Sequence, residues 1–211
     1  MGQNVAVTSA QYDDPGHSLE RTVYFSDAVI AIALTLLALD LPVPEKGQNV
    51  TVFLGEHFGD QYLHFLISFA VIAMYWWQHH RLFQRVARLS GRLVFFNIVS
   101  LLAIVIVPFA TRMLGVEGPL GPVFYASTMV LWGAAYVLMV ITVQAQGLWR
   151  ENTAPWVGRN MIIGTVSALG VFALSIPIAF VSANAAEYFW LVIPVTARLG
   201  RLLNRTPAPE A

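Results

Sequence analysis

The sequence predicts an all-α membrane protein with six transmembrane helices, and three observations lead to that class. Of the 211 residues, 57% are hydrophobic and only 11% are charged, whereas a soluble domain carries about 25% charged residues. Six apolar segments follow one another, and the connections between them are short and contain proline or glycine. We therefore expect one compact membrane domain at 19–205, between a polar N-terminal tail at 1–18 and a C-terminal tail at 206–211.

The first apolar segment, Thr22 to Leu41, contains a carboxylate. Twenty residues make about 30 Å of helix, which spans the hydrocarbon core of a bilayer only if Asp27 is counted inside it. The stretch after this residue, Ala28 to Leu39, is too short to span alone. Asp27 is therefore expected within the membrane helix, where an ionisable group marks a buried network or a permeation path.

Five further spans are expected after this helix. The last is the weakest, because its continuous apolar run ends at Ala197 and it reaches full length only if the arginines beyond snorkel to the interface. The expected spans are Tyr62 to His80, Leu93 to Thr111, Pro122 to Val143, Val157 to Val181, and a sixth that extends from about Tyr188 to Leu203.

The basic residues divide unequally between the two sides of this six-span arrangement. Only Lys46 and Arg112 fall on one side, and a five-span chain would move three more arginines to it. The positive-inside rule then places both termini in the cytoplasm. The cytoplasmic arginines are Arg21, Arg81, Arg85, Arg88, Arg92, Arg150, Arg159, Arg198, Arg201 and Arg205.

One face of the first helix is a stripe of branched apolar side chains with one hydroxyl. At 100° per residue Asp27 lies 140° away from Ile32, so it points into the surrounding bundle when Ile32 faces an axis. The stripe is explained either by ordinary helix packing or by the lining of a path, and Asp27 either by a structural hydrogen-bond network or by an ion site. The stripe comprises Ala28, Ile32, Thr35, Leu36 and Leu39.

The second span ends in a cluster of aromatic and basic residues at its cytoplasmic end. Trp76 and His79 share a helix face because they are three residues apart. His79 or Arg81 can reach the corner formed by Ser26 and Asp27. The adjacent histidines His79 and His80 point about 100° apart with no third ligand evident, so we expect no metal site.

The chain lacks the signatures of an enzyme. It has no cysteine, no glycine-rich phosphate loop, no nucleophile elbow and no zinc-ligand cluster. We therefore expect no catalytic residues, no cofactor and no nucleic-acid partner.

The run Arg21-x-x-x-Phe25-Ser26-Asp27-Ala28-Val-x-Ala-Ile32-Ala-x-Thr35-Leu36, followed by Trp76-x-x-His79-x-Arg81-Leu82-Phe83, resembles the transmembrane protein 175 family of cation channels. These are known from lysosomes as potassium channels and have single-repeat bacterial homologues. The resemblance is strong over the first helix, is supported at the end of the second, and is only hydropathic elsewhere.

The resemblance implies a homotetramer in a bacterial cell membrane, with one first helix per subunit around a central pore. Matching by position, Ile32, Leu36 and Leu39 are the hydrophobic constrictions and Thr35 is a polar layer beside them. The network that anchors the pore helix would comprise Arg21, Phe25, Ser26, Asp27, Trp76 and His79.

The implied activity is potassium-preferring cation permeation through a hydrophobic gate, without a carbonyl selectivity filter. Caesium, sodium and protons are further permeant candidates. Two other classes stay open: a proton-coupled transporter or proton pathway that uses Asp27 and His79, and a non-conducting membrane scaffold.

Overall fold

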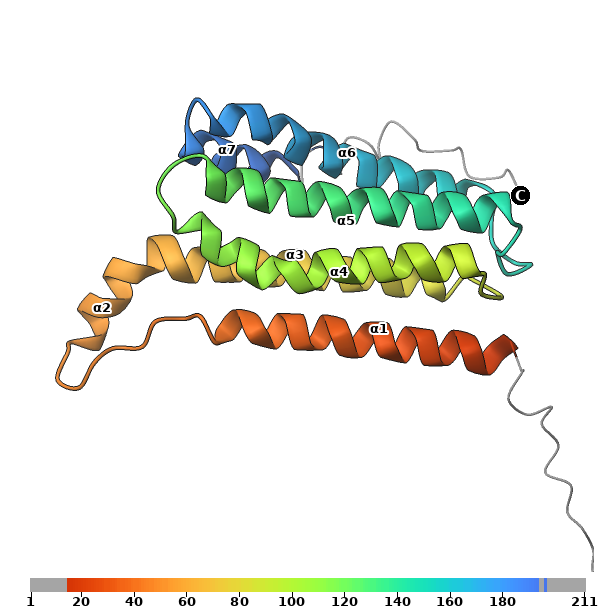
Figure 1. The fold of residues 1–211 in the computed structure, drawn as a ribbon, viewed down its shortest axis with the longest axis horizontal. Helices are drawn as coiled ribbons and strands as arrows, with labels where there is room; N and C mark the ends of the chain where they lie inside the picture. Colours follow the sequence, from red (N-terminus) through yellow and green to blue (C-terminus); the bar gives the residue numbers. More distant parts are fainter. Residues whose placement is uncertain (1–14, 194–195, 197–211) are drawn as a thin grey trace, which may run out of the picture.

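A computed structural model describes residues 15–193 and residue 196, and within them the chain is helical (Figure 1). Five long α-helices run side by side, and two short α-helices lie at one end of the bundle. The α-helices are α1 (Pro15–Ala38), α2 (Val50–His57), α3 (Leu63–Phe83), α4 (Gly91–Leu114), α5 (Leu120–Ala145), α6 (Trp156–Ala179) and α7 (Ala183–Phe189). A π-helix at Phe58–Tyr62 precedes α3, and a 3₁₀ turn at Trp190–Val192 follows α7.

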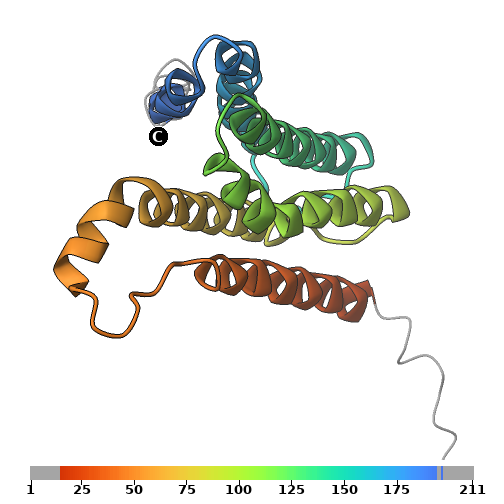
Figure 2. The same cartoon turned by 60° about the vertical axis from the view of Figure 1, so that its left-hand side comes forward.

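The helices form three layers (Figures 1 and 2). α1 alone makes one outer layer and packs against α3 and α4, which form the middle. α5 packs against α4, and α6 and α7 complete the opposite side. Because the described helices pack against α1 on one side only, they leave its other side uncovered.

Four of the described helices are long and apolar enough to cross a membrane: the Ser18–Ala38 part of α1, α4, α5 and α6. The chain is therefore a multi-pass integral membrane protein. α3 has 21 residues, enough to span, but the polar side chains of its last two turns, among them Gln78 and Arg81, lower its mean hydropathy. Most of the predicted sixth span, residues 194–203, lies outside the described residues except for Thr196.

Two elements differ from the expected segments. α1 begins at Pro15, inside the predicted N-terminal tail. α2 lies in a segment for which no helix was predicted, and Asn49 caps it by accepting hydrogen bonds from the backbone N–H groups of Thr51 and Val52. Such an N-cap asparagine was a readable signal in the sequence.

Large aromatic residues of α5 fill the space between α3, α6 and the C-terminal turn. The ring of Trp132 stacks on Tyr75 of α3, with centroids 3.5 Å apart. Tyr125 stacks on Trp190, whose indole N–H donates to Ser175 of α6. These buried contacts join α5 to α3, and join α5 through Trp190 to α6.

Candidate functional site

α1 has one buried face and one exposed face. Its buried residues recur at helical spacing and point at α3 and α4; they are Leu19, Ser26, Ile30, Ala33 and Leu37. The predicted stripe lies on the other face. Ile32 is 58% exposed, Leu36 40% and Leu39 78%. The other described residues of the chain thus leave the stripe uncovered.

Thr35 lies within this exposed face, and its hydroxyl proton is already committed. Thr35 Oγ1 donates to the Ile32 carbonyl at 2.8 Å. The oxygen lone pairs remain available as acceptors on the exposed side of the helix. This arrangement suits contact with a cation better than contact with an anion.

A chain of buried side-chain hydrogen bonds fastens α1 to α4 and α3. Asn97 Nδ2 of α4 donates to Ser26 Oγ at 3.0 Å, and Ser26 Oγ donates to the Thr22 carbonyl at 2.8 Å. His79 Nε2 of α3 lies 2.8 Å from Asn97 Oδ1 and is therefore the donor to it. Since Ser26, Asn97 and His79 are all buried, this chain fixes the rotation of α1 about its axis.

Asp27 has a separate partner on α3. The indole Nε1 of Trp76 donates to Asp27 Oδ1 at 2.9 Å, and the Trp76 ring stacks on His80. Ser26 and Asp27 therefore engage side chains of two different helices, Asn97 of α4 and Trp76 of α3. Four of the six predicted network residues, Ser26, Asp27, Trp76 and His79, are brought together here.

Two predicted members of the network lie outside it. Arg21 and Phe25 are exposed, and neither forms a hydrogen bond with the network among the described residues. Conversely, Asn97 was not predicted and is the central link. Its sequence signal was its position as the one amide within a long apolar segment, where a polar side chain needs an interhelical partner.

The two adjacent histidines diverge, as their spacing predicts. His79 turns to Asn97, whereas the ring of His80 contacts the side chain of Gln84 on its own helix. His79 Nδ1 is buried and has no hydrogen-bond partner among the described residues. No group of three or more histidine, aspartate or glutamate residues suited to a metal ion occurs in the part of the chain that the structure describes.

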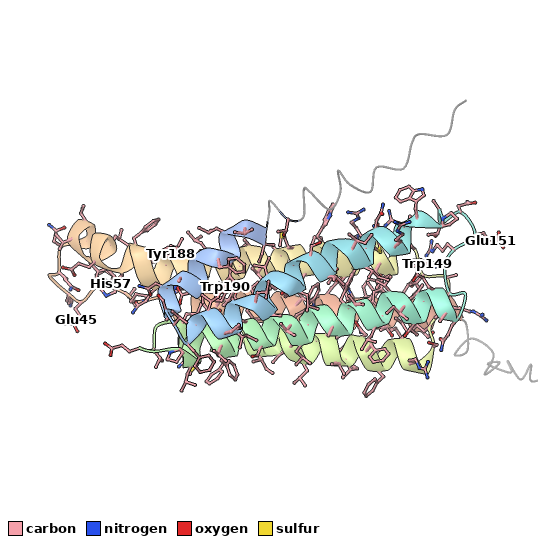
Figure 3. All side chains as sticks on the ribbon, turned by 90° about the horizontal axis from the view of Figure 1, so that it is seen from above. Glu45, His57, Trp149, Glu151, Tyr188 and Trp190 are labelled. Carbon is pink, nitrogen blue, oxygen red and sulfur yellow. The ribbon has the colours of Figure 1, made fainter. Side chains whose placement is uncertain are left out.

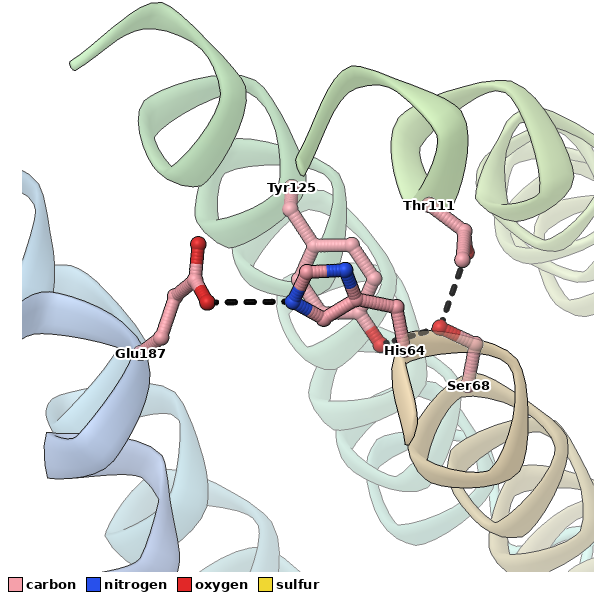
Figure 4. A network of polar contacts seen from close by, with 5 residues as sticks. All are labelled: His64, Ser68, Thr111, Tyr125 and Glu187. Carbon is pink, nitrogen blue, oxygen red and sulfur yellow. Dashed lines mark hydrogen bonds and ion pairs between the residues drawn. The ribbon is translucent and has the colours of Figure 1, made fainter. Parts of the chain in front are cut away.

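Other polar contacts join the helices at the opposite end of the bundle. His64 Nε2 of α3 lies 3.1 Å from Glu187 Oε2 of α7, and Thr111 of α4 donates to Ser68 of α3, which also contacts the Tyr125 hydroxyl (Figure 4). Arg112 and Asp40 approach at 3.4 Å on the same side. These contacts connect α3, α4, α5 and α7 rather than anchoring the stripe of α1.

The geometry defines a class of protein: a multi-pass helical membrane protein in which α1 exposes an apolar face and is anchored from behind by polar side chains. The family model for the endosomal/lysosomal potassium channel TMEM175 matches residues 21–108, which include the whole anchoring network. A potassium channel of Streptomyces collinus is 31% identical over 176 residues, which cover 77% of this chain and 83% of that protein. The chain belongs to the TMEM175 family.

Two further similarities concern an animal protein and a solved structure. The endosomal/lysosomal proton channel TMEM175 of Danio rerio is 29% identical over 212 residues, which cover 89% of this chain but 41% of the fish protein. The crystal structure of a lysosomal potassium-selective channel TMEM175 homologue from Chamaesiphon minutus has a TM-score of 0.69 and 24% identity, covering 90% of this chain and all of that chain. This structural similarity confirms the fold.

Proposed function

We propose that this chain forms a homotetrameric cation channel that prefers potassium, with the exposed stripe of α1 lining the pore. The observation that carries the proposal is the exposure of Ile32, Leu36 and Leu39 on a helix whose opposite face is fixed by Ser26, Asn97 and His79. One such helix cannot enclose a path alone, so several copies must contribute one each. The relatives described as potassium channels support the same activity.

The constriction would act by excluding water. Rings of Ile32, Leu36 and Leu39 are too apolar to replace the hydration shell of an ion, so a closed ring would dewet and a small widening would let ions pass. The Thr35 oxygen would ease the dehydration of a cation next to the narrowest ring. Selectivity for potassium over sodium would follow from the lower cost of dehydrating the larger ion, and it would be moderate.

The proposal includes six spans, formed by α1, α3, α4, α5, α6 and the segment that begins at α7, in a bacterial cell membrane with both termini in the cytoplasm. Trp149 and Glu151 lie at the opposite end of the bundle from Glu45 and His57 (Figure 3), as two sides of one membrane require. Since the chain has no cysteine, single cysteines at these loops can be labelled from either side. A thiol reagent on one side of the membrane should label Glu151→Cys, and a reagent on the other side should label Glu45→Cys.

The test is cation flux from liposomes that hold the purified protein, with potassium and sodium gradients measured in parallel. Ile32→Asn should raise the flux and reduce the preference for potassium, because an amide ring stays wet. Ile98→Asn is the matched control, because Ile98 is an exposed isoleucine on α4, away from the stripe. Unchanged permeation in Ile32→Asn and Leu36→Asn, with an intact oligomer, would overturn the pore assignment.

A proton flux assay in the same liposomes separates the channel from a proton-coupled transporter. The channel predicts that Asp27→Asn mainly weakens assembly, since Asp27 accepts from Trp76 behind the pore. The transporter predicts that Asp27→Asn abolishes flux in a folded oligomer while Ile32→Asn has little effect. The animal relative described as a proton channel is the reason to measure protons as well as metal cations.

A further inference from the structure

A slot separates α3 from α6 on the side of the molecule away from α1. Its outer part is an apolar cavity of about 270 Å³, walled by residues such as Val71, Leu169, Phe172 and Trp190. Its inner part is a cavity of about 380 Å³ that extends to the end of α3 and the start of α6. The two parts are continuous, because they share the lining residues Met74, Gln78, Gly164, Ala168 and Ile193.

The slot is long and narrow. From Ile67 in the outer part to Arg81 in the inner part, α3 rises about 21 Å, which exceeds the roughly 15 Å thickness of one leaflet's hydrocarbon. Gly164 and Ala168 are small residues one turn apart on α6, so this helix leaves the middle of the slot open. An added side chain at Gly164 would meet no atom within 4 Å of its Cβ.

The inner end of the slot carries positive charge. Arg81 and Arg85 line it together with Trp156 and Asn160 at the start of α6, where the helix dipole adds partial positive charge. The Arg85 backbone is held in place, because its carbonyl accepts from the Arg150 N–H at 2.8 Å. Neither arginine has a carboxylate partner among the described residues, and the described residues that line this inner cavity include no acidic side chain.

A polar group marks the boundary between the two parts. Gln78 accepts a hydrogen bond from Thr165 at 3.3 Å through its side-chain oxygen. Its amide nitrogen still has two N–H groups to donate. This amide lies one turn from Arg81, toward the apolar part of the slot. In a phospholipid the ester carbonyl lies between the phosphate and the acyl chain, so the amide is placed to donate to that carbonyl.

We propose that this slot binds an anionic phospholipid, with the phosphate between Arg81 and Arg85 and one acyl chain along α3 and α6. Charge and shape together select this occupant. A free anion would leave the apolar part empty, and a neutral lipid would leave both arginines without a counterion. Basic pockets between membrane helices on the cytoplasmic side are a general mode of anionic lipid binding. The slot contains no residue of the α1 stripe, so lipid binding can be tested apart from permeation, but its place on the cytoplasmic side rests on the proposed topology.

The experiment uses native mass spectrometry on the full-length protein, delipidated in detergent and titrated with phosphatidylglycerol or with phosphatidylcholine of the same acyl chains. Arg81→Gln and Arg85→Gln should each weaken phosphatidylglycerol binding by about fivefold, the usual effect of one basic residue at a membrane surface. Neither change should alter phosphatidylcholine binding. Arg88→Gln, an exposed arginine that does not line the slot, should leave both within twofold.

A steric variant tests the acyl part separately. Gly164→Leu should abolish tight binding of phosphatidylglycerol, because the added side chain enters the slot. Gly170→Leu is the matched control, because it also lies on α6 with open space around its Cβ but does not line the slot. Lipid binding is compared only among variants that keep the oligomeric size of the unmodified protein.

Three outcomes would overturn the proposal. Equal binding of the two lipids, unchanged in the arginine variants and in Gly164→Leu, would mean nonspecific surface lipid. Equally tight binding of glycerophosphoglycerol, which has no acyl chain, would mean a free-anion site. A quantitative disulfide from Gly164→Cys to Leu199→Cys or Leu203→Cys would mean that the C-terminal segment of the chain occupies the slot instead.

Discussion

α1 and α5 are both apolar membrane helices, but they are buried to very different extents. In the most apolar part of each helix, 22% of the residues of α1 are buried and 61% of those of α5. α5 is surrounded by α4, α6 and α7 and contributes Tyr125, Trp132 and Tyr136 to the core. α1 packs on one side only. The difference teaches that α5 is completed by its own chain, whereas α1 keeps an exposed face that further copies would cover in the proposed tetramer.

Exposure alone does not mark a pore helix, because α6 is as exposed as α1. What distinguishes α1 is the buried hydrogen-bond chain from Ser26 through Asn97 to His79. That chain fixes which residues of α1 face outward, so every subunit of the proposed tetramer would present the same stripe. α6 is also held by interhelical hydrogen bonds, from Thr165 to Gln78 of α3 and from Trp190 to Ser175, but these are separate contacts and not one continuous buried chain.

The largest expected effect comes from opening a cavity on the buried face of α1. Leu37 is 3% exposed, and Leu37→Ala should lower the free energy of unfolding by about 2 kcal/mol, the low end for buried leucines because the bilayer is itself apolar. Thermal unfolding in detergent should fall by about 4–8 °C. Leu36→Ala, on the exposed face, is the control and should change permeation instead. Equal unfolding temperatures for the two variants would contradict the two-faced description of α1.

The next effect comes from removing the central link of the anchor. Asn97→Leu keeps a similar volume but leaves His79 and Ser26 without their buried partner, at a cost of about 1 kcal/mol for two interhelical hydrogen bonds. The variant should also dissociate more easily into monomers on size-exclusion chromatography. Ser100→Ala is the control, because Ser100 is buried on the same helix but donates to the carbonyl of Asn97 within α4. A stable Asn97→Leu tetramer with normal flux would remove the anchor from the mechanism.

Much of α1 was predictable because its chemistry is periodic. Helical spacing alone separates Ile32 from Asp27 and sets the stripe apart from Ser26, whatever the neighbours are. The exposure of Ile32, Leu36 and Leu39 agrees with that separation. The roles of these residues in permeation stay predictions, because only flux can test them.

The rest of the site depends on distances between helices, which no local pattern encodes. Asn97 lies 71 residues after Ser26, and in the sequence it looks like an interruption of an apolar segment. The exposure of Arg21 depends on how far the N-terminal end of α1 extends past α3 and α4. The slot between α3 and α6 is also lined by residues of α5 and of the turn after α7, and nothing in α3 or α6 alone predicts it.

A smaller effect is expected at the second contact of the anchor. Trp76→Phe removes the hydrogen bond to Asp27, which lies in a partly exposed position, so the loss should be about 0.5 kcal/mol. The freed Asp27 carboxylate should be hydrated. The potassium flux should therefore change less in Trp76→Phe than in Asn97→Leu. Trp77→Phe provides the control, since Trp77 is exposed and its indole makes no described hydrogen bond. An equal response of the two variants would show that only the aromatic character of this end matters.

The smallest effect is expected where α3 packs against the aromatic residues of α5, the helix that differs most from α1 in burial. Tyr75 is fully inside the bundle, and its hydroxyl donates to the sulfur of Met129, a weak acceptor. Tyr75→Phe keeps the ring stacked on Trp132, so unfolding should shift by less than about 0.5 kcal/mol. Tyr75→Leu, which removes the stacked ring, should cost about 1 kcal/mol more, as judged by the same thermal unfolding assay. If Tyr75→Phe were as harmful as Asn97→Leu, hydrogen bonds rather than ring packing would hold both sides of the molecule together, and the contrast between α1 and α5 would disappear.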